Sequence, residues 1–108
     1  MIVRNNKKGI VKMLEGVSRQ NLAVGEKTHM VKFFFDKGST VPVHSHDHEQ
    51  TGYLLKGKII LTIDGIKHEL GEGDSWSIPG NINHGAEPLE DSVVFEVFSP
   101  LRDDYLEG

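Results

Sequence analysis

Apolar and polar residues alternate along most of this 108-residue chain. A period of two is typical of β-strands, because successive side chains of a strand point to opposite faces. The alternation predicts strands at residues 10–14, 28–35, 53–56, 58–63, 66–70, 76–78 and 92–98. Many short strands separated by turns fold into sandwiches or barrels. We therefore expect an all-β fold, either a sandwich or a barrel, and closure into a barrel would remove exposed strand edges.

The pair Asp64-Gly65 is the sharpest turn signal in the sequence. Both residue types tolerate positive φ, and apolar alternation flanks them, so we expect a two-residue hairpin turn here. The turn then fixes which residues face each other across the hairpin: Ile63 with Ile66, Leu61 with His68, and Ile59 with Leu70. Five apolar side chains share this face, and we expect it to lie against the core.

Length and charge restrict the class of protein. A chain of 108 residues is expected to form one domain, spanning 1–108. The formal net charge of −4 argues against general nucleic-acid binding, which needs a basic surface. No cysteine is present, so disulfides and thiolate metal sites are excluded. The sequence has neither an apolar run of membrane length nor a signal-peptide pattern at 1–14, so we expect no membrane contact and a cytoplasmic location.

Three histidines lie within five positions of the segment His44-Ser45-His46-Asp47-His48. Residues two apart on a strand share a face, so His44 and His46 project into the same space. Neutral imidazole is the commonest protein ligand for metal ions. From these two residues alone, a metal site and a pair of exposed strand histidines both remain open.

The spacing around the histidines resembles the two motifs of the cupin superfamily. The segments are GSTVPVHSHDHEQTGYLLKG and GDSWSIPGNINH. The motif positions are occupied by Gly38, His44, His46, Gln50, Gly57, Gly73, Pro79 and His84. The resemblance implies a single-domain cupin, a jelly-roll or double-stranded β-helix barrel, with motif 1 at 38–57 and motif 2 at 73–88. Asn81 stands in a glycine position of the second motif, and asparagine also tolerates the left-handed backbone of a turn.

The same resemblance implies a metal centre held by His44, His46, Gln50 and His84. Gln50 replaces the usual glutamate, and Glu49 would compete as a ligand if the register slipped by one residue. Three neutral imidazoles and a neutral carboxamide leave a divalent ion its full charge, which favours an anionic substrate. Such a ligand set accepts Zn, Mn, Fe, Ni or Co, so the cofactor expected is one divalent transition-metal ion.

Within cupins, the segments HSHDHEQTGYLLKG, IPGNINHGAEPLEDSVV and FEVFSPLRDDYL resemble the small pectin-degradation cupins of the KdgF type. Members of that group convert 4,5-unsaturated monouronates into the linear keto form. The resemblance places the group's acidic catalytic residue, aromatic residue and arginine at Glu96, Phe98 and Arg102. Glu96 stands where aspartate is common, which lengthens the side chain by one methylene.

The residues themselves suggest roles at this site. Glu96 shares a strand face with Val94 and Phe98, and a carboxyl buried among apolar neighbours has a raised pKa suited to acid–base catalysis. The alternative is that Glu96 points into solvent. Arg102 is suited to bidentate binding of a substrate carboxylate, and the alternative is an ion pair with Asp103 or Asp104.

Other residues have weaker signals. Tyr53 and Trp76 are candidates for aromatic walls of a sugar pocket, or for ordinary packing residues. We expect His29 and His68 to be structural, His48 to be an exposed loop residue, and 103–107 to form a solvated tail.

Three functions follow from these expectations. The first is a metal-dependent enzyme that opens and tautomerises a sugar acid, with Glu96 moving protons and Arg102 binding the carboxylate. The second is a cupin dioxygenase, and the third is a non-catalytic module that binds a small ligand or metal. The expected partner is a small anionic sugar or other small molecule, without nucleic acid. Resemblance to small cupins also implies a homodimer.

Overall fold

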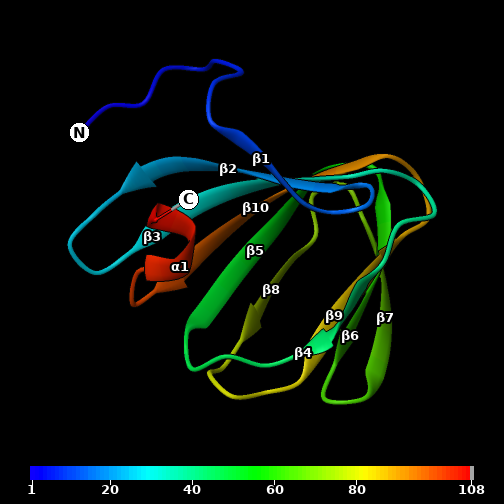
Figure 1. Cartoon of the computed structure of the whole chain (residues 1–108). Coiled ribbons are helices and arrows are strands. Elements are labelled where there is room, and N and C mark those ends of the chain that lie inside the picture. The colour runs from blue at the N-terminus through cyan, green and yellow to red at the C-terminus, as the bar shows by residue number, and fades with distance from the viewer. Residues whose placement is uncertain (108) are drawn as a thin grey trace.

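The computed structural model describes residues 1–107, and nearly all regular structure in this range is β-strand (Figure 1). The elements in chain order are β1 (Ile10–Leu14), β2 (Val17–Val24), β3 (His29–Phe35), β4 (Val41–His44), β5 (Glu49–Lys56), β6 (Lys58–Ile63), β7 (Ile66–Gly71), β8 (Ser75–Ile78), β9 (His84–Pro88), β10 (Ser92–Ser99) and α1 (Asp103–Leu106). The prediction of an all-β fold is therefore confirmed.

The strands form two antiparallel sheets. The larger sheet has the order β1-β2-β3-β10-β5-β8, and the smaller has the order β4-β9-β6-β7. Among residues 1–107, no hydrogen-bonded ladder joins the two sheets, so the expected closure is not a continuous ring of strand pairs. In Figure 1 the two sheets diverge from one end of the molecule, and α1 lies beside β3 and β10 at the opposite end of the larger sheet.

Seven of the strands were predicted, with β1 and β6 at the expected bounds. β2, β4 and β9 were missed because their sequences do not alternate cleanly. β2 buries the polar side chains of Arg19 and Gln20 and has an irregular register near its end. β4 contains a proline, and its last three residues are exposed. Alternation identifies only strands that bury one regular apolar face.

The hairpin between β6 and β7 has the predicted turn and register. Asp64 and Gly65 have φ values of 50° and 79°, and all three expected residue pairs are formed. The expectation that the whole face is core is wrong for β7, where Ile66 and His68 are exposed. β7 is the edge strand of its sheet, and on this strand Leu70, at the end away from the turn, packs against the core.

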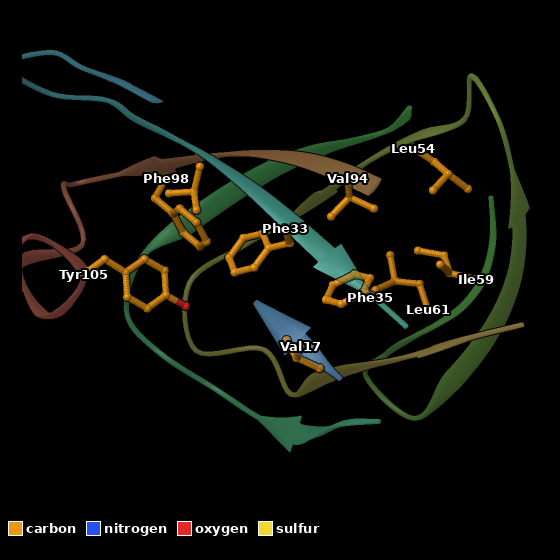
Figure 2. Packing of buried hydrophobic residues seen from close by; sticks show 10 residues of the cluster. Val17, Phe33, Phe35, Leu54, Ile59, Leu61, Val94, Phe98 and Tyr105 are labelled. Atoms are coloured by element: carbon orange, nitrogen blue, oxygen red, sulfur yellow. The ribbon is translucent and has the colours of Figure 1, made fainter. Parts of the chain in front are cut away.

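The core lies between the two sheets (Figure 2). Phe33 is central to it, with ring centroids 6.1 Å from Phe35, 6.3 Å from Phe98 and 6.2 Å from Tyr105. Phe98 and Tyr105 lie at the α1 end of this cluster, and Leu61 lies at the far end (Figure 2). The aromatic residues thereby fix the inner face of β10 and the position of α1. No helix within the described range is long and apolar enough to span a membrane.

Candidate metal centre

Three histidines converge where β4 and β9 pair. His44 ends β4, His84 begins β9, and these two residues are direct ladder partners. His46 follows two residues after His44, and its ring centroid lies 4.9 Å from that of His84. The candidate ligand atoms of the three side chains all lie within 4.8 Å of one another. The predicted histidine positions are thus brought together, including one from a distant segment.

Hydrogen bonds determine which ring nitrogen is free. Each Nδ1 lies at hydrogen-bond distance from a backbone carbonyl: His44 from Pro42 (2.8 Å), His46 from His48 (3.0 Å) and His84 from Ile82 (2.8 Å). A carbonyl only accepts, so the proton of each neutral ring is on Nδ1, and Nε2 keeps its lone pair. Within residues 1–107, the buried Nε2 of His46 has no partner. This is the arrangement of metal-binding imidazoles.

The electrostatic surroundings keep the inner histidines neutral. Burial, with a smaller contribution from the positive charge of Arg102, lowers the pKa of His46 to about 4. Burial also lowers the pKa of His84. A neutral imidazole is the form that binds metal ions, so no proton needs to be displaced at neutral pH.

Gln50 supplies the fourth candidate ligand. β5 alternates exposed and buried residues, so Gln50 points inward with 6% exposure, whereas Glu49 points to solvent. In the described range, the buried Oε1 of Gln50 has no hydrogen-bond partner. Three imidazole nitrogens and one carboxamide oxygen fit a divalent transition-metal ion. The unpartnered atoms of His46 and Gln50 are the observations that support this fit.

The four candidate ligands line a cavity of about 410 Å³, which also contains Glu96, Phe98 and Arg102. Most of the remaining wall is apolar and comes from β1, β3 and the core. The cavity is large enough for a small organic ligand. The acidic residue, the phenylalanine and the arginine predicted from the sequence therefore surround the same space as the histidines.

Glu96 lies inside the cavity rather than in solvent. β10 buries every second residue, and Glu96 is 6% exposed between Val94 and Phe98. Trp76 donates its indole N–H to Glu96 Oε1 at 3.2 Å, and Oε2 has no partner in the part of the chain described. Burial raises the pKa of Glu96 to about 8, although the hydrogen bond from Trp76 and the neighbouring Gln50 side chain oppose the shift. Its carboxyl is therefore protonated at neutral pH.

Arg102 is buried at the α1 end of the cavity. Its guanidinium lies 4.9 Å from the Phe98 ring centroid and 4.0 Å from that of Tyr105. It also forms a bidentate ion pair with Asp104. Of the two alternatives from the sequence, the Asp104 pair is present, and it joins the buried Arg102 at the cavity to an aspartate side chain that is 59% exposed. Binding of a substrate carboxylate by Arg102 stays a prediction.

The two predicted aromatic walls lie elsewhere. Tyr53 points from β5 to the outer face of the larger sheet, where it lines a shallow groove with Met30 and Phe95, so it is not a wall of the cavity. Its position follows from the strand period, because Gln50 and Tyr53 are an odd number of residues apart. Trp76 lies behind Glu96 and contacts its carboxyl, but is not among the residues that line the cavity.

Sequence reasoning missed part of the site. Residues 103–106 form α1 instead of a solvated tail, with Tyr105 buried and Asp104 at the cavity. His48 is partly buried against Phe98 rather than exposed in a loop. His29 is structural, as expected, and its role is to accept the backbone N–H of Arg102. An apolar Tyr105-Leu106 pair inside an acidic segment was the available signal for α1.

A family model, described as the cupin domain, matches residues 31–98, a range that includes all four candidate ligands and Glu96. The chain belongs to the cupin family. Its two antiparallel sheets correspond to the double-sheet jelly roll that cupins share.

This cupin is similar to the pectin degradation protein KdgF of Dickeya dadantii (strain 3937), with 35% identity over 94 residues, 85% of this chain and 86% of the relative. It also resembles the structure of KdgF from Halomonas sp., with a TM-score of 0.91, 33% identity and 96% of each chain covered. An RmlC-like cupin from Shewanella frigidimarina NCIMB 400 gives a TM-score of 0.91 at 32% identity, covering 96% of this chain and 94% of the other.

Proposed function

We propose that this cupin binds one divalent transition-metal ion and converts a 4,5-unsaturated monouronate, or a related sugar acid, into its linear keto form. The similarity to KdgF, a pectin degradation protein, supports this class of substrate. The proposed ligands are His44, His46, His84 and Gln50, whose candidate ligand atoms face one cavity. When bound, the ion supplies positive charge that holds and polarises hydroxyl groups of the sugar.

The position of Glu96 is the observation that carries the proposal. Its carboxyl is buried in the same cavity as the three histidines, and a pKa of about 8 keeps it protonated at neutral pH. A protonated carboxyl beside a bound enol ether is suited to general-acid catalysis. Glu96 would deliver its proton to C4 of the unsaturated ring.

The bond changes balance without an oxidant. The hydroxyl on C1 loses its proton and becomes a carbonyl while the bond between C1 and the ring oxygen breaks. The ring oxygen becomes the C5 carbonyl, and the electrons of the C4=C5 bond take the proton from Glu96. The reaction is an isomerisation, and the hydroxyl proton lost at C1 replaces the one that Glu96 gives.

Arg102 would orient the substrate. Its guanidinium borders the same cavity as Glu96 and carries a permanent positive charge. A planar uronate carboxylate matches the bidentate geometry of a guanidinium. Binding the carboxylate at this end of the cavity would hold the ring between Arg102 and the proposed metal ligands.

The direct test follows the loss of the conjugated absorbance of an unsaturated monouronate. We expect loss of absorbance with the metal-loaded protein, little loss after chelation, and recovery when metal is restored. A saturated uronate is the control. Oxygen consumption during turnover would favour a dioxygenase, and ligand binding without turnover would favour a non-catalytic module. Either result would contradict the proposal.

A further inference from the structure

The edge of the Arg102 guanidinium that could bind an anion already binds the carboxylate of Asp104. Arg102 Nε donates to Asp104 Oδ1 at 3.1 Å, and Nη2 donates to Asp104 Oδ2 at 2.9 Å. These two parallel hydrogen bonds are the geometry in which an arginine binds a free carboxylate. Asp104 also borders the cavity, so this internal carboxylate lies where an incoming anion would bind.

Arg102 is held in place without the help of Asp104. Its backbone N–H donates to Nδ1 of the fully buried His29 at 3.2 Å. Its guanidinium lies 4.9 Å from the Phe98 centroid and 4.0 Å from the Tyr105 centroid. Such cation–π contacts restrict the guanidinium plane. The loss of the Asp104 contact would therefore leave Arg102 positioned at the cavity.

The helix that carries Asp104 is also fixed, whereas the Asp104 side chain is not. Arg19 Nη1 and Asn21 Nδ2 both donate to the Tyr105 carbonyl, at 3.2 Å and 3.0 Å. These bonds anchor α1 to β2. The Asp104 side chain is 59% exposed, while that of Arg102 is 11% exposed. Asp104 can thus turn into water by side-chain rotation alone, and an exposed carboxylate loses little on release.

We propose that Asp104 is an exchangeable internal carboxylate. It pairs with the Arg102 guanidinium until the carboxylate of a ligand replaces it. The inference rests on the proposed function in one respect, since it takes Arg102 as the group that receives the substrate carboxylate. Asp104 is then a specificity-determining residue. A monocarboxylate such as a uronate displaces Asp104, and a neutral sugar, which cannot replace the ion pair, leaves it in place.

The exchange is tested by measurements of ligand binding to this chain, both as purified and metal-loaded. The probes are D-galacturonate and, as the neutral control, D-galactose. Asp104→Asn removes the competing charge, and we expect it to tighten galacturonate binding about two- to fivefold. Asp103→Asn is the matched control, because Asp103 is the neighbouring aspartate and, among the described residues, no side-chain hydrogen bond or ion pair joins it to Arg102. We expect no change in that variant.

A second variant isolates the role of Arg102. In an Arg102→Gln background, Asp104→Asn should leave galacturonate affinity unchanged, because the group over which the two carboxylates compete is absent. In the wild-type protein, titration with galacturonate should shift the NMR resonance of the Arg102 Nε–H group, and titration with galactose should not.

The outcomes separate the two proposals. Weaker, unchanged or undetectable galacturonate binding in Asp104→Asn would overturn the exchange and make Asp104 a brace for Arg102. An unmoved Arg102 resonance during galacturonate titration would overturn it independently of any variant. If Asp104→Asn tightens binding but unsaturated uronate is not converted, the exchange stands and the proposed function fails.

Discussion

The histidines of this cupin differ in whether a ring nitrogen is left without a hydrogen-bond partner. In His46 the Nδ1 proton is held by a carbonyl and the buried Nε2 has no partner within residues 1–107. In His29 both ring nitrogens have partners, since Nε2 contacts Asn21 and Nδ1 accepts from Arg102. Only the first arrangement leaves a lone pair for a metal ion. The difference lies in the surroundings and not in the residue type.

His46 gives the clearest residue-scale test of the metal centre. We expect His46→Ala to lower metal affinity by at least about 100-fold, since it removes a ligand, and loss even of outer hydrogen-bond partners costs about 10- to 100-fold. Isothermal titration with zinc measures the change. His68→Ala is the control, because His68 is exposed on β7, away from the cavity. Equal zinc affinity in the two variants would contradict the centre.

Glu96 allows a second test, through the pH dependence of activity. The conversion rate should fall as pH rises and Glu96 loses the proton it must donate, and the positive charge of the bound ion should place this fall below the pKa of about 8 that Glu96 has without metal. Glu96→Gln should lose most of the turnover while metal content is unchanged. A variant that keeps full activity, or a rate that rises through this pH range, would exclude Glu96 as the acid.

The raised pKa of Glu96 also predicts a pH dependence of the stability of the metal-free protein. Burial raises the pKa of Glu96 from 4.5 to about 8, so the protonated form stabilises the fold fully below about 4.5 and this contribution is lost as pH rises toward 8. The free energy of unfolding should fall relative to Glu96→Gln by at most about 1.4 kcal/mol per pH unit. Urea unfolding of both proteins between these pH values measures the difference. Parallel curves would contradict the burial of an ionisable group.

At the scale of elements, β5 and β8 cooperate to position Glu96. Gly52 on β5 is the ladder partner of both Glu96 on β10 and Trp76 on β8. A Cβ atom on Gly52 would lie 2.2 Å from Trp76 Cε2, so only glycine leaves space for the indole that donates to Glu96. The central strand therefore determines the position of the indole.

Gly52→Ala tests this packing. We expect it to destabilise the fold by about 1–3 kcal/mol, because the added methyl group forces the indole or the strand to move. Trp76 is the single tryptophan, so its fluorescence spectrum should shift as well. Gly71→Ala is the matched strand control, since nothing lies within 4 Å of the Cβ it would add. Similar effects of the two substitutions would contradict the proposed contact.

At the scale of the whole molecule, the candidate ligands connect both sheets. Gln50 comes from the larger sheet, whereas His44 and His84 come from the smaller one. An ion held by both sheets binds only the folded chain, so zinc at 100 times its dissociation constant should add about 2.7 kcal/mol to the free energy of unfolding. Thermal unfolding with and without chelator measures this effect. A midpoint that does not respond to zinc would contradict a site shared by the sheets.

The homodimer expected from the resemblance to small cupins also belongs at this scale and stays a prediction. We expect a solution mass of twice the 12.0 kDa of the chain. Light scattering at working concentration measures the mass. A value of one chain mass would contradict the expectation.

Much of the fold was predictable from local chemistry. The Asp64-Gly65 turn and the register of its hairpin depend on backbone preferences of adjacent residues, and both were correct. Asn81 takes the positive φ of 66° that its residue type tolerates. β2 was missed because it buries the polar side chains of Arg19 and Gln20, which breaks the alternation. β9 was missed because its pairing depends on β4 and β6, which are distant in the chain, rather than on its own alternation.

The sequence by itself determined the β-strand period, the tight turn and the spacing of His44, His46 and Gln50, because these depend on neighbours along the chain. Only the tertiary structure decided that Tyr53 faces away from the cavity and that Glu96 is buried beside Gln50. It also decided that the Asp104 carboxylate pairs with the Arg102 guanidinium. Those outcomes depend on which face of each strand is covered and on where α1 packs. Both are set by the balance of burial over the whole chain, which no local pattern contains.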